Sequence, residues 1–460
     1  MHIVHTAASL SGLASDETAP HSVVIGRATR VGRRTKLGAI MEVSQQDSKN
    51  AVRAAVIGNV LEWYDFSVYA FVAPIIAKKF FPAADDVTAL LSTFLAYGLG
   101  FIARPLGGVI IGRYGDTHGR KTALLLTIFM MAAGTVLVGL LPTYAAIGFV
   151  APLLLVVARL MQGFSAGGEW GGSTAYIVEW APKGKRGWYG SFQQMSVVAG
   201  LLLGSGVAAL FNTILTTAQM EDWGWRVLFL LGGILGPVGM YMRRTMKETP
   251  AYEGAAHKAV ARAGDASGFA LGIRAFGFTV AWTVCFYILL SYMPTYTAKY
   301  LKLSTAAALW ANTAGLIVLV IFIPLMGALS DRIGRKPLLL ACCFAFIVLP
   351  YPVFNYLLSG IGVGELIAVQ MLFALLISMF SGPGPAAIAE IFPTRNRSTW
   401  MTAGYALSVA IFGGFAPYIS VWLIDRFASP MAHIYYLMAA ALVSLLVIST
   451  LKETAHDELA

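Results

Sequence analysis

Long apolar runs dominate this sequence, and their length constrains the fold more than any other feature. About 20 helical residues cross about 30 Å of hydrocarbon, and about twelve runs reach that length. Only 12% of the residues are charged, against about 25% in soluble domains, so the apolar surface exceeds what one water-soluble core buries. The sequence therefore predicts an all-α integral membrane protein with twelve transmembrane helices. The predicted spans are 51–77, 88–112, 122–141, 147–178, 188–214, 225–243, 269–298, 305–329, 337–358, 363–389, 399–424 and 431–451.

Basic residues set the expected orientation in the membrane. The net charge of +10 would raise the question of nucleic acid in a soluble protein, but most Lys and Arg residues here fall on alternate loops. Such loops stay on the cytoplasmic side, so both termini are expected there and no nucleic-acid partner is expected. Residues 1–50 contain no apolar stretch long enough for a secretory signal, and we interpret them as a disordered lead, with Met41 as an alternative start.

Two loop motifs occur twice, which indicates an internal duplication. The sequence GRYGDTHGRK (112–121) matches GALSDRIGRK (327–336), and EWAPKGKR (179–186) matches EIFPTRNR (390–397) at nearly the same spacing. An even number of helices per half gives parallel repeats, related by an axis along the membrane normal. We expect, in chain order, a lead (1–50), a six-helix bundle (51–244), a cytoplasmic loop (245–268), a second six-helix bundle (269–451) and a short cytoplasmic tail (452–460).

The paired loops resemble the signature of the major facilitator superfamily. The motifs GNVLEWYDFSVYAF, RPLGGVIIGRYGDTHGRK, RLMQGFSAGGEWGG and the terminal LKETA are similar to those of its metabolite:proton symporters, which include citrate, α-ketoglutarate, shikimate and proline/betaine carriers. The resemblance covers about residues 50–455 and implies alternating access, in which two halves rock about one central site. It implies no cofactor, because the proton gradient supplies the energy.

In this family the charged loops help to hold the two halves together at the cytoplasmic seam. The resemblance implies that role for Asp116 and Asp331, with Arg120 and Arg335 as partners. The second pair of motifs adds four residues to the expected latch, Glu179, Arg186, Glu390 and Arg397. Thr117 departs from the family, which usually has Arg there. The alternative is that these loops serve only as positive-inside anchors.

Ionisable residues inside spans indicate where the transport chemistry lies, because each costs at least about 2.5 kcal/mol to insert. In the first span, four polar residues fall within about 120° of one another on the helix; they are Asn59, Glu62, Asp65 and Tyr69. Arg159 in the fourth span lies at a matching depth. We predict that Asp65, or Glu62 as second choice, carries the proton and that Arg159 is its switchable partner. A static buried ion pair is the alternative.

Further polar residues in the spans are candidates for binding substrate. Arg159 and Gln162 match the superfamily's fourth-helix motif, which the resemblance associates with proton transfer. Arg104 is either a carboxylate clamp or a structural residue, paired with a carboxylate such as Glu169 or snorkelling to the inner interface. The second half offers neutral groups, of which Tyr287 either binds substrate or only packs. The expected substrate-binding set is Arg104, Arg159, Gln162, Asn59, Tyr69 and Tyr287, and the other neutral groups noted are Tyr292, Asn312 and Gln370.

The expected function is a symporter of a bacterial inner membrane that imports a small carboxylate metabolite, such as citrate, α-ketoglutarate or another di- or tricarboxylate, with protons. The alternatives are proton symport of a zwitterionic osmolyte such as proline or glycine betaine, and a transporter-like sensor. The sequence GFSAG (163–167) fits the nucleophile elbow of hydrolases but lies inside a span, so no enzyme activity is expected. We expect a monomer whose partners are the solute, protons and the lipid bilayer, and no metal site.

Overall fold

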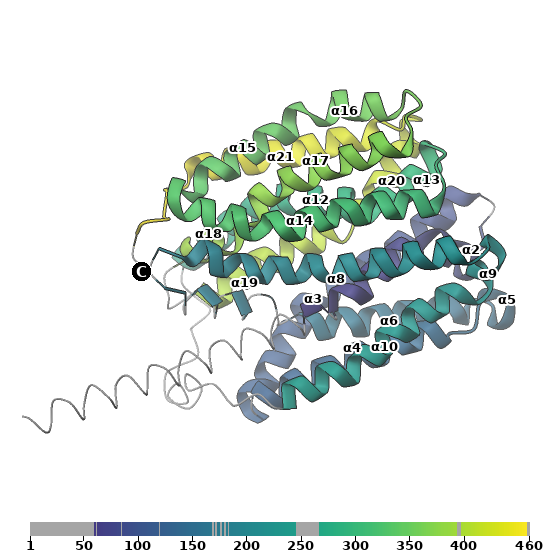
Figure 1. Ribbon diagram of the computed structural model, residues 1–460. Coiled ribbons are helices and arrows are strands. Elements are labelled where there is room, and N and C mark those ends of the chain that lie inside the picture. The colour runs from purple at the N-terminus through teal and green to yellow at the C-terminus, as the bar shows by residue number, and fades with distance from the viewer. Residues whose placement is uncertain are drawn as a thin grey trace, which may run out of the picture. The chain divides into compact units, whose positions relative to one another are not determined.

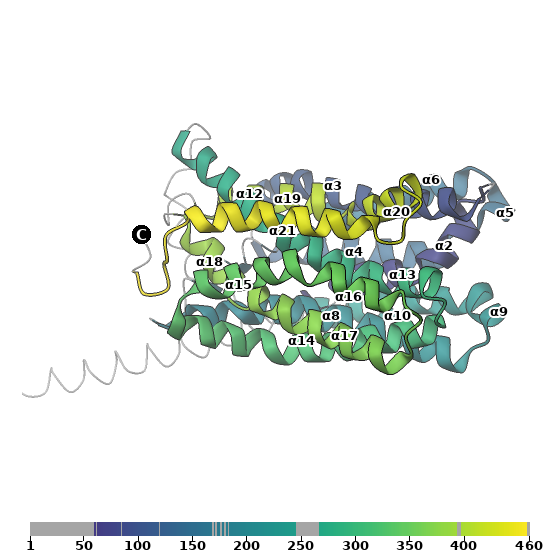
Figure 2. The same ribbon diagram turned by 90° about the horizontal axis from the view of Figure 1, so that it is seen from above.

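The computed structural model describes residues 59–244 and 266–457, except for positions 61, 84, 119, 168–169, 171–172, 175–176, 179–180, 183 and 393–396. Within this part of the chain every regular element is a helix, so the all-α prediction is confirmed. The long helices run side by side along one direction (Figures 1 and 2). The predicted lead, 1–50, and most of the predicted central loop, 245–265, lie outside the described residues.

Each predicted span contains described helix, and the helices of the first half form one group. Its first helix comprises the helical residues 59–60 and 62–71. The elements that follow are α2 (Ala73–Phe80), α3 (Asp86–His118), α4 (Arg120–Leu140), α5 (Tyr144–Ile147), α6 (Val150–Ala166), α8 (Arg186–Ile214), α9 (Thr217–Gln219), the π-helix η1 (Met220–Gly224) and α10 (Trp225–Arg244). Within this group α3 packs on α6, and α4 packs on both α6 and α10.

The second half repeats this arrangement with more breaks in its helices. Its elements are α12 (Ala266–Phe286), η2 (Tyr287–Tyr292), α13 (Met293–Tyr300), α14 (Thr305–Ile333), α15 (Arg335–Val348), α16 (Pro350–Leu357), α17 (Val363–Ser381), α18 (Gly384–Glu390), α19 (Arg397–Ser408), η3 (Val409–Gly413), α20 (Ala416–Arg426) and α21 (Ala432–Thr450). α15 and α16 meet at 47°, where Pro350 and Pro352 remove backbone donors and stop the first helix from continuing.

Length and composition make many of these helices able to span a membrane. In the described residues, seven helices are long and apolar enough to cross it, and the bent pair of α15 and α16 makes an eighth. Shorter apolar helices cover Leu125–Leu140 and Val150–Ala166. Large apolar side chains such as Leu106, Phe149, Phe344 and Leu446 are exposed, which suits a surface surrounded by lipid and would be unfavourable in water.

The two halves meet mainly where α8 runs alongside α14 (Figure 1). Glycines allow this close approach, because a Cβ at Gly187 or at Gly327 would collide with the other helix. The halves also meet where α3 contacts α19, η3 and α20. Side chains at these contacts form the aromatic pocket between the halves, which is described below with the polar groups inside the first half.

Candidate functional site

The centre of the first half contains a buried carboxylate and a buried guanidinium that lie at one level of the bundle. Arg159 Nη1 lies 3.8 Å from Asp65 Oδ2, and Gln162 connects them. Gln162 Oε1 accepts a hydrogen bond from Arg159 Nη1 at 2.8 Å, and Gln162 Nε2 donates to Asp65 Oδ2 at 2.5 Å. The first helix and α6 therefore bring together Asp65 and Arg159, two of the three residues that the sequence proposed for proton coupling, with Gln162 of the proposed substrate-binding set between them.

Aromatic rings enclose the Arg159 guanidinium. Its central carbon lies 4.3 Å from the Tyr69 ring centroid and 4.9 Å from that of Phe66. The Tyr69 hydroxyl donates to the Thr93 carbonyl at 3.0 Å. Tyr69 therefore forms one wall of the Arg159 site, and both side chains are fully buried.

A cavity of about 30 Å³ lies beside Asp65, inside the first half. The first helix, α4, α6 and α10 line it, and both Glu62 and Asp65 are on its wall with the hydroxyls of Thr127, Thr135 and Ser165. Asp65 Oδ1 is buried and accepts no hydrogen bond from the described residues. Because a water molecule needs about 10–15 Å³ and two or more polar partners, this cavity has room and partners for water.

Glu62 forms a second buried ion pair, and its partner is Arg104. Arg104 Nη2 lies 3.2 Å from Glu62 Oε1, and both side chains are buried. The guanidinium lies over Phe66 and Phe101, with 4.5 Å to each centroid, and over Trp63 at 5.4 Å. Snorkelling of Arg104 to the inner interface was the wrong alternative, because the carboxylate and the three rings hold it inside the bundle. Glu169 lies outside the described residues.

Asn59 points away from this site, although it shares the predicted polar stripe. Its Nδ2 donates to Ser196 Oγ at 2.7 Å and to the Gln193 carbonyl at 3.3 Å. These bonds tie the first helix to α8. The helical wheel placed Asn59 with Asp65, but the two residues face different neighbouring helices.

An aromatic pocket of about 10 Å³ lies between the two halves. The first helix and α8 contribute to it from one half, and α12, η2 and α19 from the other. Its lining residues are Trp63, Gln194, Trp282, Thr283, Phe286, Tyr287 and Tyr405. Buried Tyr287 Oη and Gln194 Oε1 have no hydrogen-bond partner among the described residues, which is unusual for buried polar atoms and marks groups available to a ligand.

The ring contacts make this pocket an extended aromatic cluster. Trp170 stacks on Tyr405 with 3.4 Å between centroids, and Trp282 packs edge-on against both. The ring centroids of Trp63 and Tyr287 lie 6.1 Å apart. Sequence reasoning identified Tyr287 but missed Trp282 and Tyr405. The available signal was Trp282 in the middle of an apolar span, away from the interface belts where such residues gather.

The other neutral groups noted in the second half pack within the helices, and each keeps one buried polar atom without a hydrogen-bond partner among the described residues: Asn312 Oδ1, Tyr292 Oη and Gln370 Nε2. Asn312 Nδ2 donates to the Leu290 carbonyl at 3.1 Å and to Ser205 Oγ at 3.3 Å. Tyr292 packs edge-on against Phe94 of the first half, with 5.8 Å between centroids. Gln370 is buried in α17, against α14. Asn312 and Tyr292 thus join the halves.

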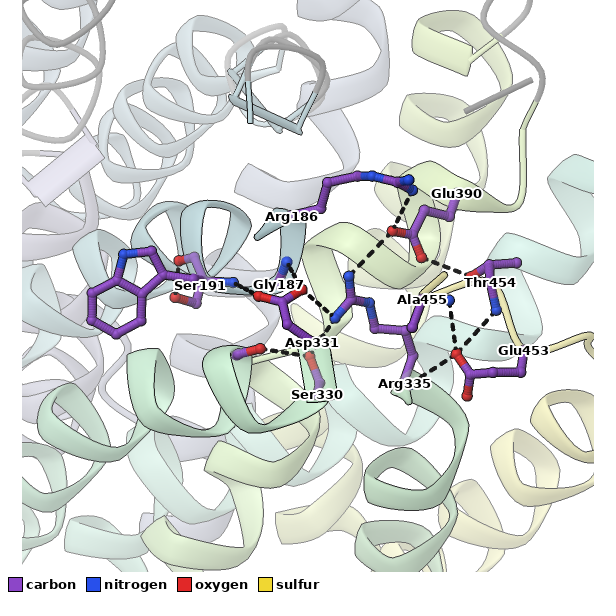
Figure 3. A network of polar contacts seen from close by, with 12 residues as sticks. Arg186, Gly187, Ser191, Ser330, Asp331, Arg335, Glu390, Glu453, Thr454 and Ala455 are labelled. Atoms are coloured by element: carbon purple, nitrogen blue, oxygen red, sulfur yellow. Dashed lines mark hydrogen bonds and ion pairs between the residues drawn. The ribbon is translucent and has the colours of Figure 1, made fainter. Parts of the chain in front are cut away.

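At one end of the bundle, charged residues from both halves form a network, which we call the charged end (Figure 3). Arg186 at the start of α8 pairs with Glu390 at 2.9 Å. Asp331 accepts hydrogen bonds from the backbone N–H groups of Gly187 and Trp188, each at 2.9 Å. Arg335 contacts Asp331 at 2.7 Å and Glu390 at 3.4 Å. Four residues of the expected latch are therefore in contact across the seam.

The C-terminal tail joins this network, which the sequence did not predict. Glu453 Oε1 accepts from Arg335 N at 3.0 Å, and Glu453 Oε2 accepts from Lys336 N at 2.8 Å. Thr454 Oγ1 donates to Glu390 Oε2 at 2.7 Å. The signal for this contact in the sequence was the terminal LKETA, which is similar to a motif of the resembled family. The side chains of Asp116, Arg120, Glu179 and Arg397, also predicted for the latch, lie outside the described residues.

The comparisons with known proteins agree with this architecture. The Sugar (and other) transporter model matches residues 51–267, and the Major Facilitator Superfamily model matches residues 296–459. A proline/betaine transporter of Escherichia coli strain K12 is 36% identical over 427 residues, covering 89% of this chain and 85% of the relative. A citrate-proton symporter of Klebsiella pneumoniae is 33% identical over 414 residues, covering 89% and 90%.

A solved structure shows the same fold. The xylose transporter XylE from E. coli, in a partially occluded inward-open conformation, has a TM-score of 0.71 at 18% identity, and the match covers 90% of this chain and all of that one. The sequence identities show the family that the motifs resemble, and the fold, the duplicated loops and the two helical halves agree with it. The chain belongs to the major facilitator superfamily, among its metabolite:proton symporters, and is a multi-span membrane protein.

Proposed function

We propose that this protein is a proton-coupled symporter of a small zwitterionic osmolyte of the proline or glycine betaine class. The sequence favoured a di- or tricarboxylate and kept the zwitterion as the alternative. Of the two relatives named above, the proline/betaine transporter has the higher identity. One observation carries the proposal: the pocket between the halves is aromatic and lies beside the ion pair of Glu62 and Arg104, which has no net charge.

The charges around the pocket suit a solute without net charge. None of the described residues that line it is Lys or Arg, and the neighbouring guanidinium of Arg104 is already matched by Glu62. A di- or tricarboxylate would bring two or three negative charges to a site whose neighbouring cation, Arg104, is already neutralised by Glu62. Burying that unmatched negative charge is costly in free energy. A zwitterion adds no net charge.

The two ends of a zwitterion match the two kinds of group present. Its carboxylate suits the Arg104 guanidinium, which binds carboxylates in a bidentate manner. Its ammonium or trimethylammonium suits the rings of Trp63, Trp282 and Tyr405, since cations gain about 0.5–2 kcal/mol over aromatic faces. The Tyr287 hydroxyl beside them has no hydrogen-bond partner among the described residues and can donate to the solute.

The remaining parts support alternating access driven by protons. The Asp65–Gln162–Arg159 cluster is a buried carboxylate with a switchable cation, and the charged end joins α8 to the second half (Figure 3). We place the charged end on the cytoplasmic side of a bacterial inner membrane, where the positive-inside rule puts such residues. Opening that seam releases the solute inward, and the cycle needs neither a cofactor nor enzyme chemistry.

The test is uptake by purified protein in liposomes with an imposed pH gradient. Radiolabelled glycine betaine and proline should accumulate when the outside is acidic, and an uncoupler should abolish the accumulation. Citrate and α-ketoglutarate should neither accumulate nor compete. Accumulation of a di- or tricarboxylate in preference to either zwitterion would overturn the proposal, and binding without accumulation would favour a sensor.

Variants of the pocket sharpen this test. Trp282→Ala and Tyr405→Ala should each raise the KM for glycine betaine by about tenfold, the equivalent of about 1.4 kcal/mol of lost cation–π contact. Trp310→Ala is a matched control, because this Trp is exposed at the far end of α14 and donates only to Thr213 at 3.1 Å. An equal effect of all three variants would indicate general loss of packing and no specific cation site.

A further inference from the structure

The carboxylates of the two buried ion pairs of the first half lie three residues apart on one face of the first helix and line one cavity. Glu62 and Asp65 both line the cavity of about 30 Å³ and are the two carboxylates on its wall within the described part of the chain. Asp65 has an oxygen, Oδ1, that is buried and has no partner among the described residues. The three hydroxyls of the wall supply further hydrogen-bond partners for water, so the cavity can connect the carboxylates without contact between them.

Glu62 also connects this cavity to the aromatic pocket between the halves. Its partner Arg104 lies over Trp63, which lines that pocket, and over Phe101, whose ring packs edge-on against Tyr287 at 5.3 Å. The link from Asp65 is one contact longer, because its partner Arg159 lies over Phe66, and the Phe66 ring in turn packs against Trp63 with 6.2 Å between centroids. A proton that reaches Glu62 from the cavity can therefore change the binding site in the aromatic pocket.

We propose that Glu62 is a second proton acceptor that couples protonation to substrate binding, and that water in the cavity carries the proton to it from Asp65. The inference rests on the proposed function for the identity of the solute. In the step, the Asp65 carboxyl group gives its proton to water, and that water chain delivers a proton to the Glu62 carboxylate. Asp65 becomes a carboxylate beside Arg159, while neutral Glu62 releases Arg104.

Released Arg104 then binds the carboxylate of the incoming solute. The charges balance throughout, because Arg104 exchanges one carboxylate partner for another and Arg159 regains one. Among the described residues, the groups that face the two carboxylates electrostatically include Arg104 from α3, Arg159 from α6, and the phenols Tyr64, Tyr287 and Tyr405. The described residues of α4 and α10 present hydroxyl and apolar groups to the cavity, and these groups bring no charge to the exchange.

The test separates driven accumulation from exchange. Liposomes carrying wild type, Glu62→Gln, Glu62→Asp or Glu221→Gln are assayed for accumulation driven by a pH gradient and for counterflow at equal pH. Glu62→Gln mimics the protonated residue, so it should lose accumulation by about tenfold or more, keep counterflow, and show a counterflow KM that no longer varies with pH. Glu62→Asp should keep a titrating group and recover part of the accumulation.

Glu221→Gln is the matched control, because it removes an ion pair of the same chemistry at 2.6 Å from Lys78 on the exposed surface. It should behave as wild type in both assays. Accumulation by Glu62→Gln at the wild-type level overturns the relay. So does loss of counterflow in both Glu62→Gln and Glu62→Asp, which would show a purely structural pair.

Two further arms keep the outcome decisive. If Glu62→Gln does not fold, Thr127→Val removes a hydroxyl from the cavity wall at nearly the same size; it should slow driven accumulation severalfold and leave counterflow unchanged, and an unaltered rate overturns the relay. If wild type carries no zwitterion, the proposed function fails, and the same variants are compared with the solute that is carried. The two failures are thus distinguishable.

Discussion

At the residue scale, Glu453 shows how one tail side chain holds a helix terminus. Its carboxylate accepts hydrogen bonds from the backbone N–H groups of Arg335 and Lys336, which open α15, and from those of Thr454 and Ala455. The first N–H groups of a helix have no partner within it, so an anion there is favourable. Burial raises the pKa of Glu453, but these four backbone hydrogen bonds outweigh it and leave the pKa below the ordinary value of 4.5.

The lowered pKa of Glu453 predicts a stabilising contribution with a defined pH range. A depressed carboxylate pKa stabilises the folded state above the ordinary value, and this contribution is lost as the pH falls through the folded value. Replacing Glu453 with Gln should therefore lower the thermal midpoint of the purified protein by a similar amount from about pH 8 to about pH 5. The difference from wild type should shrink below about pH 4. A difference that grows on acidification would contradict this.

Arg159 shows a different use of a single residue. The guanidinium contacts Gln162 and lies over two rings, and both contacts need its planar, delocalised charge. A Lys there would keep the charge but lose the fork and the stacking. The site thus depends on the shape of the cation as well as on its sign.

At the element scale, glycines decide how closely α3 and α6 cross. A Cβ at Gly163 would collide with the backbone of Gly100, and one at Gly167 would collide with the carbonyl of Arg104. This crossing fixes Arg104 and Arg159 near the first helix. The small residues of such a pair allow backbones to approach in lipid, where apolar surface alone gives no drive for helices to associate.

Gly163→Ala should therefore destabilise the protein by about 1–3 kcal/mol, the usual cost of overpacking. The expected readout is a lower thermal midpoint together with reduced uptake, because α6 carries Arg159 and Gln162. Gly206→Ala is the control, since a Cβ there meets no atom within 4 Å. If both variants were equally stable, the close crossing would not matter for the fold.

Two π-helical turns adjoin the aromatic pocket. η2 begins at Tyr287, and η3 ends at Gly413, where a Cβ would come 2.7 Å from the Tyr287 ring. Such turns insert an extra residue, rotate the helix beyond them and recur at functional sites. Here they flank Tyr287, whose ring contacts Trp63 and Phe101 of the first half.

At the scale of the whole molecule, Asp331 ties the second half to the first α8 turn. Replacing it with Asn removes the negative charge beside two backbone N–H groups and Arg335, at a cost of about 1–2 kcal/mol. The equilibrium should shift toward a conformation open at the charged end. Labelling of a cysteine introduced at Ser191, which is fully buried in that seam, should then be about tenfold faster.

A carboxylate with the same chemistry inside one half provides the control. Asp85 accepts from the backbone N–H of Thr88 at 2.8 Å, near the start of α3. Asp85→Asn should leave labelling at position 191 unchanged. Equal labelling rates with and without Asp331→Asn would show that this carboxylate anchors a loop and does not control the seam.

The sequence by itself determined the all-helical membrane fold, because about twelve apolar runs leave the backbone no other way to satisfy its hydrogen bonds in lipid. Helical spacing and depth counted along the chain also brought Asp65 and Arg159 to one level. Period and depth cannot say which neighbouring helix a side chain faces. The tertiary structure therefore decided that Asn59 contacts α8, that Glu62 takes Arg104, and that Trp282 and Tyr405 meet Trp63 between the halves. It also decided where the tail binds, since contacts between residues distant in sequence arise only when the helices pack.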